Sequence, residues 1–174
     1  MRSSDLLVDA FGRIRERVHQ TLHGLTQGQL ALRPDPEANS IAWLVWHLTR
    51  VIDDHLADAA GTSQVWTADG WQGRFDLPFD ASATGYGQGP AEVAALGSTS
   101  GALLLEYHDA VHAKAVDFVS GVKDEDLPKI VDRRWDPPVT LGVRLVSVID
   151  DAMEHVGQAA YLRGLIERGL EPSD

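Results

Sequence analysis

Four segments of this 174-residue chain repeat their apolar residues at intervals of three and four positions. Such intervals place the apolar side chains on one face of an α-helix. The last segment is the most regular, with alternating steps of four and three from Leu141 to Ile166. The segments cover residues 4–23, 39–61, 100–120 and 140–169. Four amphipathic helices of this length predict an all-α fold, a four-helix bundle.

Residues that favour helix starts stand at the beginnings of these segments. Asn39 or Ser40 is a good cap for the second predicted helix, and Thr140 for the fourth. After the first helix, Thr26 and Gln29 have the spacing of a capping box, which predicts one short additional turn of helix.

The connection between the second and third predicted helices, residues 61–99, is far longer than bundle connections usually are. Its aromatic residues, spread among glycines, are Trp66, Trp71, Phe75, Phe79 and Tyr86. Two compatible interpretations are a folded-over loop that covers the core and a wall for a pocket or subunit interface. Residues 128–136 are expected to form a short extended piece, without a clear β-sheet pattern. We expect residues 1–174 to form a single domain.

The composition limits the partners and the chemistry. The net charge of −11 argues against nucleic acid and anionic membranes, which both attract basic surfaces. No segment resembles a signal peptide or the roughly 20 apolar residues of a membrane helix, which predicts a cytoplasmic protein. The chain has no cysteine, so a protein thiolate is excluded and any thiol must come from a small molecule.

A histidine and an aspartate on the fourth predicted helix suggest a metal site. Asp151 and His155 are four residues apart and therefore lie on the same side of one helical turn. His47 lies in the apolar run WLVWHL, where burial disfavours a charged imidazole and each ring nitrogen needs a partner. Two nitrogens and one carboxylate oxygen, with one position left open, are typical of a catalytic divalent-metal site.

The residues alone leave other interpretations open. His47 can be a hydrogen-bonded core residue, and Asp151 with His155 can be an ordinary helical ion pair. On the third predicted helix, His108 and His112 have a His-x-x-x-His spacing that suits zinc.

A further polar cluster follows His47 on the second predicted helix. It consists of Asp53, Asp54 and His55, which we interpret mainly as groups that are solvated or hydrogen-bonded to a metal ligand.

Two stretches, NSIAWLVWHLTRVIDDH (39–55) and TLGVRLVSVIDDAMEHVGQAAYLRGLI (140–166), resemble the DinB superfamily, in the branch labelled DUF664. The resemblance covers almost the whole chain. It implies a four-helix bundle with up-down-down-up connectivity and a metal triad that matches His47, Asp151 and His155. This chain departs from the superfamily at the second of these ligands, Asp151. That position is most often histidine in the superfamily and is glutamate in the similar mycothiol-dependent maleylpyruvate isomerases. The resemblance gives His108 and His112 no ligand role.

Several members of this superfamily are thiol S-transferases. Together with the absence of cysteine and an Arg-, Ala- and Gly-rich composition, the resemblance implies a transferase that uses mycothiol and an electrophilic small molecule. The implied metal is divalent, zinc first and nickel second, and family members often form homodimers. Gln158 and Asp54 are assigned to hydrogen bonds with the ligands, and Gly157 to making room for a helix or ligand.

Substrate contacts are assigned to Trp46 and Trp71 by stacking and to Arg144 by binding a carboxylate. The alternatives are core packing for Trp46, and a solvated surface position or a helix-end charge for Arg144. Two other functions stay open: a hydrolase or isomerase whose metal holds water, and a non-catalytic metal- or ligand-binding stress protein.

Overall fold

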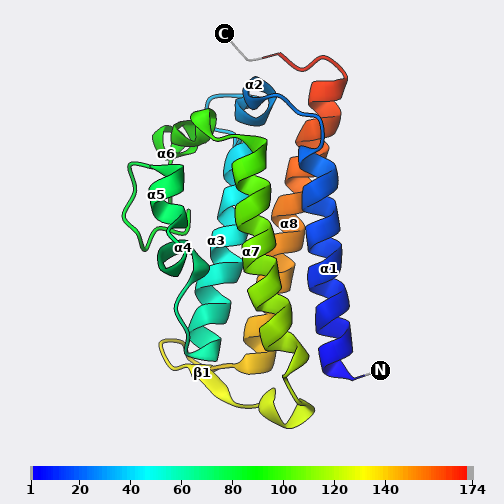
Figure 1. Cartoon of the computed structure of the whole chain (residues 1–174), viewed down its shortest axis with the longest axis vertical. Coiled ribbons are helices and arrows are strands. Elements are labelled where there is room, and N and C mark those ends of the chain that lie inside the picture. The colour runs from blue at the N-terminus through cyan, green and yellow to red at the C-terminus, as the bar shows by residue number, and fades with distance from the viewer. Residues whose placement is uncertain (1, 172–174) are drawn as a thin grey trace.

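The computed structural model describes residues 2–171 and confirms the all-α fold. Its long helices are α1 (Ser3–Leu22), α3 (Ile41–Ala60), α7 (Gly101–Ser120) and α8 (Leu141–Glu167). Figure 1 shows α1 and α8 running upward from the same end of the molecule, while α3 and α7 run downward. The up-down-down-up connectivity implied by the resemblance is therefore present.

Each long helix packs against two of the other three, and the first three turns of α3 are buried nearly all round. Both α1 and α3 pack against α7 and α8, which closes a four-membered ring of helices. The core between them contains Phe11, Ile14, Val18, Leu44, Leu48, Tyr107, Val111, Leu145 and Val148. Because α3 and α8 run antiparallel in contact with each other, residues early in α3 lie beside residues late in α8.

The predicted helix caps are confirmed. The Ser40 hydroxyl accepts from the Trp43 N–H at 3.2 Å, and the Thr140 hydroxyl accepts from the Val143 N–H. Thr26 and Gln29 form the capping box of the short helix α2 (Gln27–Ala31).

The long connection forms several short helices, which sequence periodicity did not predict: α4 (Val65–Ala68), α5 (Trp71–Phe75), α6 (Pro90–Ala95) and η1 (Leu96–Ser98). Trp66, Trp71 and Phe75 are buried and contact Tyr107 of α7, so this part of the connection covers the core. Tyr86 is 95% exposed and does not.

After the one-turn helix η2 (Asp124–Asp126), the chain forms a small hairpin. Strand β1 (Ile130–Asp132) pairs antiparallel with β2 (Val139–Thr140), with Ile130 opposite Thr140. The extended piece was predicted, whereas its pairing into a sheet was not, because strands of two or three residues are too short to show alternation. Within residues 2–171, no helix is both long enough and apolar enough to cross a membrane.

Candidate metal centre

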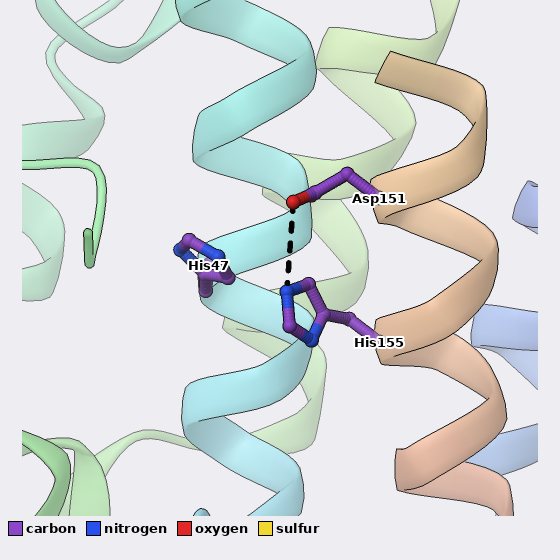
Figure 2. Close-up of side chains that lie close together, drawn as sticks. All are labelled: His47, Asp151 and His155. Carbon is purple, nitrogen blue, oxygen red and sulfur yellow. Dashed lines mark ion pairs between the residues drawn. The ribbon is translucent and has the colours of Figure 1, made fainter. Parts of the chain in front are cut away.

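The structure brings His47, Asp151 and His155 together across the contact between α3 and α8 (Figure 2). One potential ligand atom from each residue lies within 4.8 Å of the other two. Among the described residues this is the only such group of three or more His, Asp or Glu side chains. The antiparallel contact of the two helices produces this meeting of residues that are about a hundred positions apart.

His47 is buried and held in one orientation. Its Nδ1 lies 2.5 Å from the backbone carbonyl oxygen of Thr84, and its ring stacks on Trp43 at 4.6 Å between centroids. A carbonyl oxygen only accepts, so Nδ1 is the donor and Nε2 keeps its lone pair. Burial lowers the pKa of His47, although the bond to Thr84 opposes this effect. The neutral imidazole with a free Nε2 is the form that binds metals.

His155 is oriented in the same way by different groups. Its Nδ1 lies 3.1 Å from Oε1 of Gln158, and its Nε2 lies 3.6 Å from Oδ1 of Asp151. The Asp151 carboxylate raises the pKa of His155, and burial opposes this effect. Both imidazoles therefore turn Nδ1 toward an oxygen acceptor and leave Nε2 for the space between the three side chains.

The Asp151 carboxylate supplies a direct test of whether a cation fits. Its Oδ2 is buried and has no hydrogen-bond partner among the described residues. An unpaired buried carboxylate oxygen is costly, and a divalent cation would supply the missing partner. With two imidazole nitrogens and a carboxylate oxygen, the donor set suits zinc and other divalent transition metals.

Of the residues assigned to hydrogen bonds with the ligands, Gln158 contacts one and Asp54 does not. Gln158 contacts His155, as described above. Asp54 instead accepts from Gln64 Nε2 at 2.7 Å and lies 3.6 Å from His55, so the structure does not bring it to the three ligands. At Gly157 an added Cβ would meet no atom within 4 Å, so no neighbouring helix needs the glycine.

The residues assigned to substrate contacts lie in other clusters. Trp46 is fully buried against Trp66 and Phe79. Trp71 packs on Tyr107 beneath the guanidinium of Arg74.

The hydrogen bonds of Arg144 go to residues other than the three ligands. Its Nη2 donates to Asp132 Oδ2 at 2.8 Å, and its Nη1 lies 3.3 Å from Nδ1 of His55. Arg144 thus joins α8 to β1 and α3 and is not solvated surface.

The two histidines of α7 do not form a comparable centre. His108 is buried, its Nδ1 bonds to the Thr49 hydroxyl at 3.0 Å, and burial lowers its pKa to about 3. Neither His108 nor His112 belongs to a group of three potential ligands among residues 2–171.

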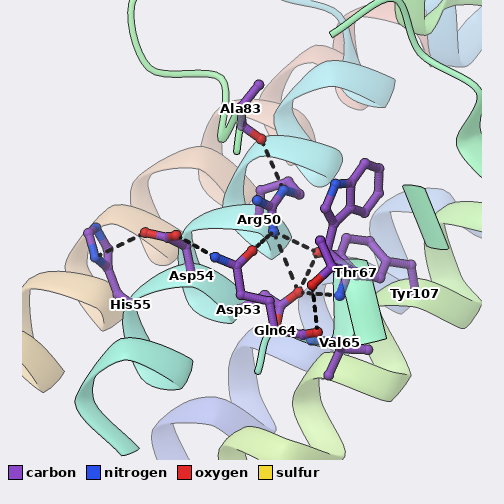
Figure 3. A network of polar contacts seen from close by, with 10 residues as sticks. Arg50, Asp53, Asp54, His55, Gln64, Val65, Thr67, Ala83 and Tyr107 are labelled. Carbon is purple, nitrogen blue, oxygen red and sulfur yellow. Dashed lines mark hydrogen bonds and ion pairs between the residues drawn. The ribbon is translucent and has the colours of Figure 1, made fainter. Parts of the chain in front are cut away.

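Asp53 is a correction to the sequence interpretation, because it is buried rather than solvated. Figure 3 shows it within a network centred on Arg50. Its carboxylate accepts from the N–H groups of Val65 and Trp66 at 2.8 Å each and from the Tyr107 hydroxyl at 2.9 Å. Burial raises the pKa of Asp53, and these bonds oppose the rise.

Residues 83–88, which lie against His47 and Arg50, were not predicted to belong to the site. The only signal was the glycine-rich run TGYGQG, since a backbone carbonyl such as that of Thr84 leaves no trace in residue types.

A cleft of about 430 Å³ lies between α3, α4 and α7, and none of the three ligand residues lines it. Its walls include Ile52, Leu56, Val111, Lys114 and Phe118. The candidate metal centre is therefore separate from this cleft, and the Asp151 side chain is 34% exposed.

Comparison with known proteins extends over nearly the whole chain. The family model described as Mycothiol-S-transferase matches residues 6–168. A similar solved structure is that of a conserved protein from Enterococcus faecalis, with 32% identity and a TM-score of 0.89, covering 97% of this chain and 99% of that one. A search of curated proteins found no match. On the match over residues 6–168, this chain belongs to the mycothiol S-transferase family, which is DinB-like as the sequence resemblance predicted.

Proposed function

We propose that this protein, acting as one domain, is a divalent-metal-dependent S-transferase that joins mycothiol to an electrophilic small molecule. The family supports thiol transfer, and the metal dependence rests on two observations at one site. Three ligand atoms from His47, Asp151 and His155 converge within 4.8 Å, and Oδ2 of Asp151 is buried without a partner. Zinc is the first candidate and nickel the second. The homodimer and the cytoplasmic location stay predictions.

Each residue of the site has a separate role in this proposal. His47 and His155 would hold the ion through Nε2, and Asp151 through its carboxylate. When bound, the ion acts as a Lewis acid that lowers the pKa of a coordinating thiol toward neutrality. Thr84 and Gln158 keep the two Nδ1 protons away from the ion. In the overall reaction the thiol sulfur forms a bond to the electrophilic carbon, the leaving group departs with its electron pair, and the thiol proton passes to solvent.

The metal is tested first. We expect elemental mass spectrometry to find near-stoichiometric zinc or nickel in the purified protein, or after incubation with either ion. His47→Ala should remove most of it, while His23→Ala, at an exposed histidine far along the chain from the site, should not. A wild-type protein that takes up neither ion would overturn the metal-dependent proposal.

Thiol transfer is tested on the metal-loaded protein with mycothiol and 1-chloro-2,4-dinitrobenzene, whose thioether product absorbs light. We expect turnover above the uncatalysed rate with mycothiol and much less with cysteine. Turnover of an ester or other substrate without thiol would favour the hydrolase or isomerase alternative. Stoichiometric metal without turnover of any substrate would favour the binding protein.

A further inference from the structure

One face of α3 holds residues 83–88 alongside the candidate metal centre. Trp43, His47 and Arg50 lie at intervals of four and three residues and therefore share that face. Trp43 Nε1 donates to Gln88 Oε1 at 2.8 Å, His47 Nδ1 to the Thr84 carbonyl, and Arg50 Nε to the Ala83 carbonyl at 3.0 Å. The three donors thus hold the first two residues and the last residue of the segment.

Gly85 packs closely against the helix, beside Trp43 and His47. Its φ is +102°, a conformation that L side chains rarely adopt. A Cβ at this position would collide with Nδ1 of His47 and come within 3.1 Å of the Trp43 ring. The missing side chain therefore permits the carbonyl of Thr84 to reach Nδ1 of His47.

Arg50 is itself held firmly, so it can serve as an anchor. Its guanidinium is fully buried, donates to Gln64 Oε1 at 2.9 Å and lies 5.0 Å above the Trp66 ring. Its charge is balanced by Asp53, 3.5 Å away. In Figure 3 the Arg50 side chain extends from this network toward Ala83.

From this arrangement we propose that Gly85, the Thr84 carbonyl and Arg50 position the imidazole of His47. The segment holds the ring as the Nδ1–H tautomer, with Nε2 directed at Asp151 and His155. Thr84 contacts His47 directly, and Arg50 acts on it through the Ala83 carbonyl, so both are positioning residues. This inference rests on the proposed metal site for its functional meaning, but the tautomer of His47 can be measured without any metal.

The chain offers a matched pair of variants for the test. Gly85→Ala and Gly87→Ala both place a Cβ at a positive φ, +102° and +74°, and so share the backbone strain. Only the Cβ at residue 85 meets His47, because nothing lies within 4 Å of a Cβ at residue 87. Zinc dissociation constants are measured by competition with a chromophoric chelator.

We expect Gly85→Ala to weaken zinc binding by about 10- to 100-fold, the usual effect of disturbing a hydrogen-bond partner of a metal-bound histidine. Gly87→Ala should stay within about threefold of the wild type. Equal zinc affinities of the two variants, both folded by circular dichroism, would overturn the proposal.

A second measurement covers the case in which Gly85→Ala does not fold. Two-dimensional ¹H–¹⁵N spectra of the metal-free wild type report which ring nitrogen of His47 carries the proton, with His47→Gln used to assign the signal. We expect the Nδ1–H tautomer, and an Nε2–H tautomer or an averaged signal would contradict the positioning role. If the wild type binds no zinc while His47 is Nδ1–H, the proposed function fails and the positioning of the ring stands.

Discussion

At the scale of single residues, we expect Asp151 to favour metal binding without stabilising the metal-free fold. In the metal-free protein its Oδ2 is buried and unpaired, while Oδ1 faces the Nε2 of His155 at 3.6 Å. We choose pH 9 so that His155 is neutral. Its Nδ1–H then donates to Gln158, and its Nε2 is an acceptor that faces the acceptor Oδ1 of Asp151. Asp151→Asn offers an N–H donor to Nε2 of His155. We therefore expect the free energy of unfolding, measured with urea in the presence of a chelator, to stay the same or rise by up to about 1 kcal/mol. Zinc affinity should fall at least tenfold.

The neighbouring Asp150 gives the control for this prediction. It is exposed, so Asp150→Asn removes the same charge without touching the site. We expect it to leave zinc affinity within about twofold and stability within about 0.5 kcal/mol. If Asp151→Asn destabilised the metal-free protein and kept zinc affinity, the carboxylate would be a structural group.

The residue scale also shows what the sequence can reveal of a site. Residue type, expected burial and helical spacing made His47, Asp151 and His155 candidates, and the resemblance to the DinB superfamily favoured them over His108 and His112. The Thr84 carbonyl was not, since any residue could supply it. The bond between Arg144 and Asp132 was not predicted either, because Asp132 lies on a strand too short to predict.

At the scale of elements, the short helix α4 depends on Asp53. The carboxylate accepts from Val65 N–H and Trp66 N–H, donors that a four-residue helix cannot satisfy within itself. Removing it also leaves the buried Arg50 without its counter-charge. We expect Asp53→Ala to lower the free energy of unfolding by about 3–5 kcal/mol. Hydrogen exchange of residues 62–85 should accelerate more than exchange in α1.

Asp54 is the control, since it is the next residue on α3 and its side chain is one-third exposed. Asp54→Ala removes a bond to Gln64 and should cost no more than about 1 kcal/mol. Similar losses in both variants, or exchange that rises equally across the chain, would refute a specific dependence of α4 on Asp53.

The same example explains which elements could be predicted. The long helices bury whole faces, so each carries its own periodicity and caps such as Ser40 and Thr140. Helix α4 is stabilised by a residue twelve positions earlier, and a local pattern does not contain that contact. Asp53 was interpreted as solvated or hydrogen-bonded to a metal ligand because it lies in the polar run Asp-Asp-His, and only the packed connection shows that it is buried.

At the scale of the whole molecule, the stability of the bundle should fall as the pH drops from 7 to 5. His108 lies between α7 and Thr49 of α3, and burial lowers its pKa to about 3 from an ordinary value of 6.5. Below pH 6.5 the unfolded chain takes up a proton that the folded chain excludes, so acid favours unfolding. His108 alone should remove about 2 kcal/mol between pH 7 and 5. Charged and titratable neighbours with smaller effects than burial are Arg15, His19, Asp109 and His112.

Two variants separate this contribution from the other titrating groups. His108→Gln keeps a donor for Thr49 and does not titrate. Its free energy of unfolding, measured with urea and a chelator, should therefore fall by about 2 kcal/mol less than that of the wild type between pH 7 and 5. Asp132→Asn should leave the slope in that window unchanged. The reason is that Arg134 and Arg144 lower the pKa of Asp132, so its stabilisation is complete above the unfolded value of 3.8 and declines only in stronger acid. An unaltered slope in His108→Gln would mean that His108 gains its proton without unfolding and that the centre of the bundle admits water.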